Sequence, residues 1–331
     1  MSKYLICGAG GFIGGHLVKK LLCAGHEVIC ADIKPLEYWF QIYEENKNFS
    51  LDLKEYENCL KVSKGVDYVY NMACNMGGMG FIENNKAECM LSVLINTNLL
   101  RACLKNNVKK YFFSSSACVY NGSKQLQTFI PGLKESDSYP ADPEDGYGWE
   151  KLFSERMCRH FTEDFGFPTS IVRYHNVYGP LGTFDGGREK APAALCRKIA
   201  IAKINKIKSI EVWGDGQQTR SFMYIEDCIK GTEMIFNSNQ VAEVFNLGSS
   251  EQVSINQMIN QIEEISGYKV DRKYMLNKPK GVRGRNSDNE KIIKVYNWQP
   301  STLLKDGLEK TYKWIYDQII KKDNTNKFAR F

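Results

Sequence analysis

Histidine is scarce in this sequence, and cysteine is not arranged as a metal ligand. Four histidines lie far apart, at positions 16, 26, 160 and 175 of the 331 residues. Eleven cysteines include no C-x-x-C pair, and the nearest two, Cys23 and Cys30, are seven residues apart. We therefore predict no metal site and no disulfide framework. Free thiols are typical of a reducing compartment, so the expected location is the cytoplasm.

Concentrated charge is also missing, and so is a long apolar run at the N-terminus. The N-terminal apolar stretch is too short to span a membrane and has no cleavage pattern, so we expect no membrane contact. The net charge is a mild +6, and the most basic segment, residues 198–208, is more typical of an exposed helix face than of a nucleic-acid site. With 43% apolar and 25% charged residues, the composition is that of a soluble globular protein long enough for two domains.

The first half of the chain alternates short apolar runs with helical stretches. Strands are predicted at residues 3–8, 27–32, 66–73, 109–116 and 169–179, and a helix at 12–25. Apolar runs without alternation, separated by helices, indicate a parallel sheet covered on both faces. The predicted fold class is therefore α/β, a doubly wound parallel sheet (Rossmann) with a smaller α/β substrate-binding domain.

The second half has a different texture. Helices are predicted at residues 191–205, 253–267 and 303–322, and a strand at 209–216. We assign residues 1–179, with a return segment at about 221–250, to the Rossmann domain. The smaller domain takes residues 180–220 and 251–322, and residues 323–331 are expected to form a loose tail.

A glycine-rich turn between the first strand and its helix predicts a dinucleotide site. Gly8, Gly11 and Gly14 permit a tight turn and bring a pyrophosphate close to the helix N-terminus, where free N–H groups attract it. Asp32 ends the second strand, where a carboxylate accepts from ribose hydroxyls and repels a 2′-phosphate, so NAD is favoured over NADP. Asp52 is either an adenine contact or a helix N-cap. The predicted NAD-binding residues are Gly8, Gly11, Phe12, Ile13, Gly14, Asp32, Asp52, Leu53, Ala73, Tyr147 and Lys151.

Tyr147 and Lys151 form the predicted reaction centre. Their spacing of four puts both on one face of a helix. The ammonium and the nicotinamide ring are expected to lower the tyrosine pKa, so that Tyr147 exchanges a proton with a secondary alcohol during hydride transfer. With the glycine turn and Asp32, this pair resembles the extended short-chain dehydrogenase/reductase superfamily, in the branch that acts on nucleotide sugars. The resemblance implies that Ser116, at a strand end, joins them.

Further segments resemble the substrate-binding segments of this superfamily. "RYHNVYGP" and "GQQTRSFMYIED" imply that Asn176 and Arg220 approach the diphosphate of a sugar nucleotide. Arg283 and Arg285 of "RGRNSD" suit phosphate, although surface or interdomain ion pairs explain each arginine as well. Lys198 and Gln218 are further candidate contacts.

"MACNMGGMGFI", "SSSACVY" and "GGREKAPAALCRK" resemble the GDP-mannose 3,5-epimerases more narrowly, and Asn121 departs from the proline expected there. The resemblance implies that Cys118 and Lys190 act from opposite sides of the sugar, with Gly77 and Gly78 letting backbone approach it. An ordinary thiol pKa and a lysine pKa lowered by burial suit proton exchange near neutrality. The implied activity converts GDP-mannose to GDP-L-galactose through a 4-keto intermediate, with NAD regenerated each turn.

Other functions stay open at this point. A GDP-mannose or GDP-heptose 4-oxidoreductase or 4,6-dehydratase is related, but a dehydratase would want an acidic pair where this chain has Ala117 and Cys118. A sensor that binds NAD without catalysis usually lacks the Tyr/Lys pair. The superfamily also implies a homodimer, through helices near residues 88–106 and 148–165. The sequence leaves undecided which of Cys118 and Lys190 is the base.

Overall fold

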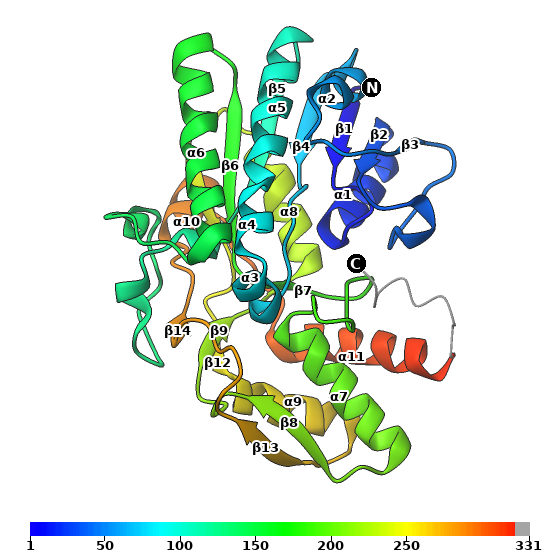
Figure 1. Ribbon diagram of the computed structural model, residues 1–331, viewed down its shortest axis with the longest axis vertical. Coiled ribbons are helices and arrows are strands. Elements are labelled where there is room, and N and C mark those ends of the chain that lie inside the picture. Colours follow the sequence, from blue (N-terminus) through cyan, green and yellow to red (C-terminus); the bar gives the residue numbers. More distant parts are fainter. Residues whose placement is uncertain (322–331) are drawn as a thin grey trace.

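Seven parallel strands form the central sheet of the larger lobe (Figure 1). The computed structural model describes residues 1–321, so the predicted tail at 323–331 lies outside the described residues. The strand order β11-β6-β5-β4-β1-β2-β3 confirms the doubly wound class. The sheet consists of β1 (Lys3–Cys7), β2 (Glu27–Asp32), β3 (Lys47–Ser50), β4 (Tyr68–Asn71), β5 (Lys110–Ser116), β6 (Thr169–Tyr174) and β11 (Val244–Leu247). Sequence patterning missed β3, because this short edge strand is largely polar and exposed.

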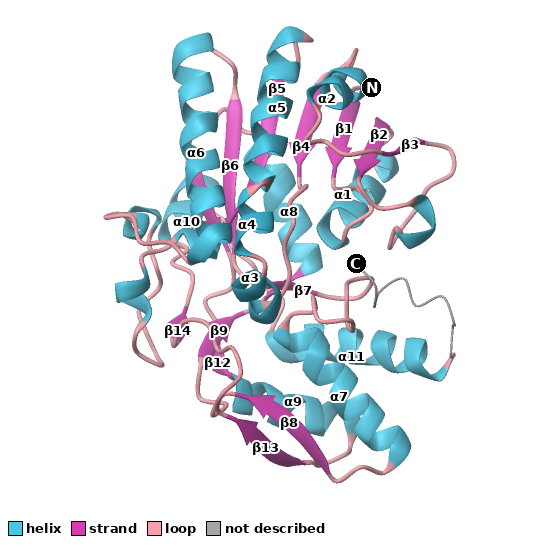
Figure 2. Ribbon diagram, viewed as in Figure 1, coloured by secondary structure: helices cyan, strands magenta, loops and turns pink. Residues whose placement is uncertain are grey.

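Helices cover both faces of this sheet, as Figure 2 shows. Along β1, Tyr4 and Ile6 point into one core cluster, and Leu5 and Cys7 point into another. The four side chains that follow Lys3 in the strand are therefore all buried, which explains the apolar run without alternation. One face carries α1 (Phe12–Cys23) and α8 (Ile225–Phe236), and the other carries α2 (Tyr56–Ser63), α5 (Ser92–Lys105) and α6 (Asp145–Phe165).

The smaller lobe packs three helices against short strands. The helices are α7 (Ala191–Asn205), α9 (Ile255–Ser266) and α11 (Leu304–Ile320). The strands are the parallel pair β8 (Ser209–Trp213) and β13 (Asp271–Met275), and the group β12 (Gln252–Ser254), β9 (Thr219–Ser221) and β14 (Gly284–Arg285). The remaining elements are α3 (Met79–Asn84), α4 (Lys86–Met90), α10 (Glu290–Tyr296), β7 (Val177–Tyr178) and β10 (Met223–Tyr224).

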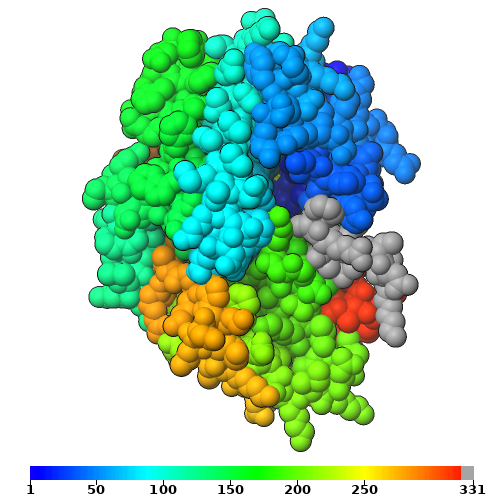
Figure 3. Space-filling view, viewed as in Figure 1, coloured from blue at the N-terminus to red at the C-terminus, as the bar shows by residue number. Residues whose placement is uncertain are grey.

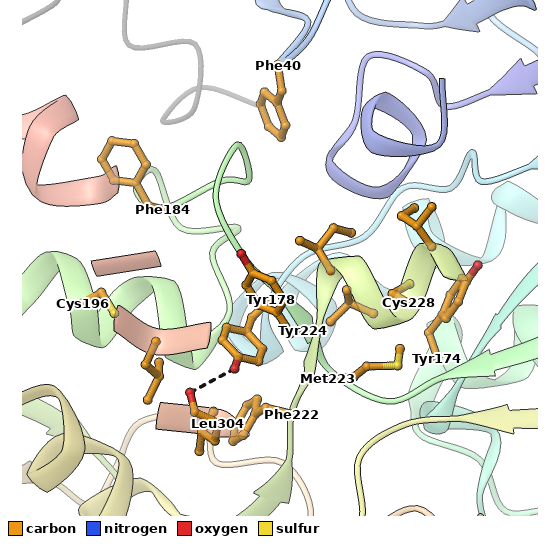
Figure 4. Close-up of a cluster of buried hydrophobic side chains, with 14 of the residues drawn as sticks. Phe40, Tyr174, Tyr178, Phe184, Cys196, Phe222, Met223, Tyr224, Cys228 and Leu304 are labelled. Carbon is orange, nitrogen blue, oxygen red and sulfur yellow. Dashed lines mark hydrogen bonds between the residues drawn. The ribbon is translucent and has the colours of Figure 1, made fainter. Parts of the chain in front are cut away.

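A shared apolar core joins the lobes (Figure 4). The ring of Tyr178 in β7 lies beside the rings of Phe222 and of Tyr224 in β10, and the Tyr178 hydroxyl donates to the Leu304 carbonyl of α11 at 3.0 Å. From this junction the chain returns to the sheet through α8 and β11. The junction places the smaller lobe over the carboxyl ends of the strands. The predicted domain boundaries themselves stay a prediction.

Candidate active site

A cavity of about 490 Å³ opens at the carboxyl ends of β1 and β4, where the strand order reverses. This switch point is the usual ligand site of a doubly wound sheet. Figure 3 shows the surface hollowed where the N-terminal residues (blue) meet the segment that includes α4 and α5 (cyan). All the predicted cofactor residues except Lys151 line the cavity: Gly8, Gly11, Phe12, Ile13, Gly14, Asp32, Asp52, Leu53, Ala73 and Tyr147.

The glycine turn packs too closely for side chains. A Cβ at Gly14 would lie 2.1 Å from the Gly8 carbonyl oxygen, so only glycine lets α1 start against the end of β1. No side chain caps this helix N-terminus, whose N-cap is Gly11. Its backbone N–H groups and dipole therefore suit an anionic group such as a pyrophosphate.

Two carboxylates mark the nucleotide end of the cavity. Asp32 accepts from the Lys34 backbone N–H at 3.0 Å, and burial raises the pKa of its carboxyl. Asp52 accepts from the Lys54 N–H at 2.9 Å, whereas the N-cap of α2 is Glu55. The alternative interpretation of Asp52 as a helix N-cap is therefore wrong.

Ser116 and Tyr147 meet at the other end of the cavity. Ser116 ends β5 and starts a 3₁₀ turn, Ala117–Val119, by accepting from the Cys118 N–H at 3.2 Å. Burial raises the Tyr147 pKa well above its usual value, and a hydrogen bond with Ser116 opposes this only in part. The chain's own groups therefore do not lower this pKa as expected. Lys151 Nζ lies over the tyrosine ring, 5.6 Å from its centroid.

Lys151 is a fully buried cation in the first turns of α6. Its Nζ lies 3.5 Å from Oε2 of Glu150 and makes no hydrogen bond of ordinary geometry within residues 1–321. Burial acts to lower the Lys151 pKa, but Cys74 and Glu150 outweigh it, and the net shift is upward. The ammonium therefore stays charged, with donors available for a ligand such as a ribose hydroxyl.

Cys118 and Lys190 lie close to this centre, and their pKa values are shifted in opposite directions. Cys118 is 8% exposed and packs with Tyr147 in a small buried cluster. Burial, then the charge of Glu144, raises its pKa to about 11, in contrast to the ordinary thiol pKa expected. Lys190 is the N-cap of α7 and lines the cavity, and burial lowers its pKa as predicted.

Arg188, which the sequence analysis did not single out, holds the loop before α7 against residues 75–81. Arg188 Nη1 donates to Asn75 Oδ1 at 2.9 Å and to the Met76 carbonyl at 3.2 Å, and its guanidinium stacks 3.8 Å over the Phe81 ring. The Gly78 N–H donates to the Arg188 carbonyl at 3.0 Å. A Cβ on Gly78 would lie 2.5 Å from the carbonyl oxygen of Glu189. Gly78 therefore serves the packing of the two loops, and contact of Gly77 and Gly78 with the sugar stays a prediction.

Two predicted arginines come together in neighbouring strands. Arg220 of β9 and Arg285 of β14 are direct partners in the parallel register. Arg285 Nη1 lies 3.6 Å from the Cys118 sulfur. Burial, then the charge of Arg285, lowers the Arg220 pKa to about 10. Paired guanidinium groups near the reaction centre suit a diphosphate.

None of the eight predicted substrate residues lines the cavity, and four of them make contacts elsewhere in the protein. Arg283 binds Asp215 through both carboxylate oxygens, at 2.8 and 2.9 Å, as the ion-pair alternative anticipated. The others donate to backbone carbonyls: Asn176 to Ser221, Lys198 to Glu211 and Gln218 to Trp213. Their substrate roles stay predictions, as do the catalytic roles above. Within residues 1–321, no three metal-binding side chains cluster.

These features define an NAD-type enzyme of the doubly wound α/β class, and comparisons with known proteins narrow the class. The model of the NAD dependent epimerase/dehydratase family matches residues 4–248. A protein from Arabidopsis thaliana named GDP-mannose 3,5-epimerase is 45% identical over 320 residues, 96% of this chain and 83% of that protein. GDP-mannose 3,5-epimerase 1 from Oryza sativa subsp. japonica is 46% identical over 317 residues, 96% and 82% of the two chains.

A solved structure agrees. UDP-glucuronic acid 4-epimerase from Bacillus cereus, in complex with UDP-glucuronic acid and NAD, has a TM-score of 0.81 and 27% identity, covering 96% of this chain and 99% of that one. The chain belongs to the NAD dependent epimerase/dehydratase family, in the extended short-chain dehydrogenase/reductase superfamily. NAD as cofactor is thereby confirmed, and the side-chain-free glycine turn, Asp32 and the available donors of Lys151 fit it.

Proposed function

We propose that this protein converts GDP-mannose to GDP-L-galactose by inverting C3 and C5 of the sugar through a transient C4 ketone. The observation that carries the proposal is that Lys190 lines the same cavity as Ser116 and Tyr147, with Cys118 packed beside Tyr147. The identity of 45–46% to proteins named GDP-mannose 3,5-epimerase supports the same reaction.

The chemistry requires each of these groups. Bound NAD would supply the hydride acceptor for oxidation at C4 and the hydride donor for its reversal. Tyr147, which lines the cavity with Ser116, takes the proton of the C4 hydroxyl and gives it back. The C4 ketone makes the C3–H and C5–H bonds acidic, because each carbanion is delocalised as an enolate. Lys190 and Cys118 exchange protons with these carbons, while Arg220 and Arg285 bind the diphosphate.

The test is proton exchange from solvent. Purified protein without added NAD is incubated with GDP-mannose in deuterated water, and the sugar is followed by NMR. We expect deuterium at C3 and C5 together with new epimers. In Cys118→Ser and Lys190→Ala we expect epimer formation to be lost while transient reduction of NAD, seen at 340 nm, persists.

Two outcomes would contradict the proposal. Absence of exchange and product with GDP-mannose would reject this substrate, and a GDP-heptose run in parallel would then identify a different sugar. Net loss of water from the sugar, or stoichiometric release of NADH, would favour a 4,6-dehydratase or a 4-oxidoreductase.

A homodimer is also part of the proposal. Large apolar side chains are exposed on two neighbouring helical segments, Met90, Leu91 and Leu94 on one and Trp149 and Phe153 on α6. The stretch Lys86–Lys105 is apolar and long enough for a membrane span by length and composition. We infer that a second copy covers this patch, since two packed helices per subunit make a four-helix bundle about a twofold axis. Leu94→Glu with Phe153→Glu should give monomers in light scattering. A cytoplasmic location stays a proposal.

A further inference from the structure

A carboxylate outside the predicted site stands beside the Cys118 thiol. Glu144 is the residue that precedes α6, and its Oε2 lies 3.0 Å from Nη2 of Arg285. Nη1 of the same guanidinium lies 3.6 Å from the Cys118 sulfur. The Glu144 carboxylate and the Cys118 sulfur are therefore contacted by the same guanidinium. Arg285 bridges the two side chains, donating to the Glu144 carboxylate and to the Cys118 sulfur.

Backbone contacts hold these side chains in place. The Glu144 N–H donates to the Cys118 carbonyl at 2.8 Å. A Cβ at Gly148 would lie 2.4 Å from that carbonyl oxygen, so glycine there lets the first turn of α6 reach the thiol. Arg285 Nε donates to Gln125 Oε1 at 2.7 Å. The Glu144 side chain is 11% exposed and that of Arg285 is 4% exposed, so solvent screens their charges only weakly.

We propose that Glu144 is a positioning residue that holds the Cys118 thiol protonated at rest, so that Cys118 is the acid and Lys190 the base of the proton-exchange pair. Arg285 keeps Glu144 ionised, and a thiolate formed beside that carboxylate would be a second negative charge in a buried site. This inference rests on the proposed function and deepens it by giving each member of the pair a direction.

The other titratable groups around Cys118 are either cations or neutral near neutrality. Arg285 on β14 and Arg220 on β9 favour a thiolate, and Lys190 before α7 does so when protonated. Tyr147 on α6 and Cys89 on α4 are neutral near neutrality, because burial raises the pKa of both. Burial together with Glu144 outweighs the cations, and the Cys118 pKa rises to about 11. Burial lowers the Lys190 pKa, which favours the neutral amine that a base requires.

The proton balance closes over one inversion. Lys190, as a neutral amine, takes the proton from one face of the carbon and becomes an ammonium. Cys118 gives its S–H proton to the opposite face of the enolate and becomes a thiolate beside Arg285. One proton then passes from Lys190 through water to the thiolate, which restores both groups without any change of oxidation state.

The test measures the Cys118 thiol without substrate. Protein carrying its NAD is treated with iodoacetamide across a range of pH, and the rate at each cysteine is read by peptide mass spectrometry. Cys23, which is exposed, serves as an internal reference. In Glu144→Gln we expect the midpoint for Cys118 to fall by about one pH unit or more, because a like charge at this range shifts a pKa by about that amount. The alkaline limb of deuterium exchange should fall with it.

Asp145→Asn is the matched control, because its carboxylate is next in sequence but pairs with the Lys86 ammonium at 3.0 Å and is 41% exposed. This variant should leave the Cys118 midpoint unchanged. If Glu144→Gln does not fold, Glu144→Asp keeps a charge for Arg285 but draws it back, and should lower the midpoint less. A midpoint that stays or rises in the folded variant overturns the proposal. A lowered midpoint without any turnover of GDP-mannose would keep the role of Glu144 and reject the proposed function.

Discussion

The two ends of the active-site cavity are built in different ways. The nucleotide end comes from one stretch of chain, β1, the glycine turn, α1 and the end of β2 at Asp32. The reaction end is assembled from segments far apart, including Ser116, Tyr147 and Lys190. Backbone contact governs the first end, since a Cβ at Gly14 would lie 2.1 Å from a carbonyl oxygen. Buried charges govern the second.

The difference implies two kinds of sensitivity. At the nucleotide end, the addition of a single uncharged methyl group should displace the cofactor. At the reaction end a substitution of nearly equal volume should suffice, provided that it changes a proton or a charge, because buried charges are weakly screened. Each of the following predictions separates the two ends by measuring bound NAD and proton exchange independently.

The largest effect is expected for Gly14→Ala. The added methyl group meets the Gly8 backbone, which cannot move without shifting β1. We expect loss of bound NAD and of all exchange, with a fall of about 1–3 kcal/mol in the free energy of unfolding. Gly15→Ala is the control, because its methyl group meets only the Gln41 side chain. NAD content after purification gives the answer, and equal retention in both variants would contradict a backbone-governed site.

Tyr147→Phe should break the reaction end alone. The hydroxyl that exchanges the C4 proton is removed, while the ring still packs with Cys118 and Ile82. We expect a loss of about 10²- to 10⁴-fold in both NAD reduction and deuterium exchange, with NAD still bound. Single-turnover absorbance at 340 nm measures the first step. Undiminished NAD reduction would assign the proton transfer to another group.

Arg188→Met should separate proton exchange from hydride transfer. The substitution removes the hydrogen bonds to Asn75 and Met76 and the stacking on Phe81, so the loop that carries Lys190 loosens. A hydrogen bond from a charged group is worth about 1.5–3 kcal/mol, so we expect deuterium exchange to slow by about tenfold or more while C4 oxidation persists.

Arg101→Met is the matched control for this loop. Arg101 also stacks on an aromatic ring, that of Tyr56 at 4.5 Å, and donates to an amide oxygen, that of Asn98. It does not line the cavity. Equal slowing of exchange in both arginine variants would show that stacking supports the fold in general rather than the position of Lys190.

The smallest expected effect is a difference between the pH at which proton exchange declines and the pH at which NAD is lost. As pH falls through the lowered pKa of Lys190, the amine becomes an ammonium and can no longer accept a proton, so exchange should decline. Asp32 has a raised carboxyl pKa and should lose its charge, and its hold on NAD, as pH falls through that separate pKa. Exchange and retained NAD, followed over the same pH series, should show two midpoints. A single shared midpoint would show that exchange declines at low pH because NAD is lost, and not because Lys190 becomes protonated.

Much of the sheet could be predicted from sequence because its signals are local. A buried strand such as β2, and a helix such as α9 with its exposed and buried sides, carry their patterns within a few turns of chain. The polar edge strand β3 carried no such pattern. At the site, Tyr147 and Lys151 share a helix face by spacing alone, whereas the protonation of Tyr147 and Cys118 depended on burial that spacing does not contain.

The sequence by itself determined most strands and helices of the sheet, the glycine turn and the types of residue available for chemistry, since each follows from neighbouring residues. Only the tertiary structure decided which charges face one another. Glu144 looks like an ordinary residue at a helix start until Arg285, from the other lobe, reaches it and the Cys118 thiol. Electrostatic energy depends on distance in space and on exclusion of water, and both are properties of the folded chain.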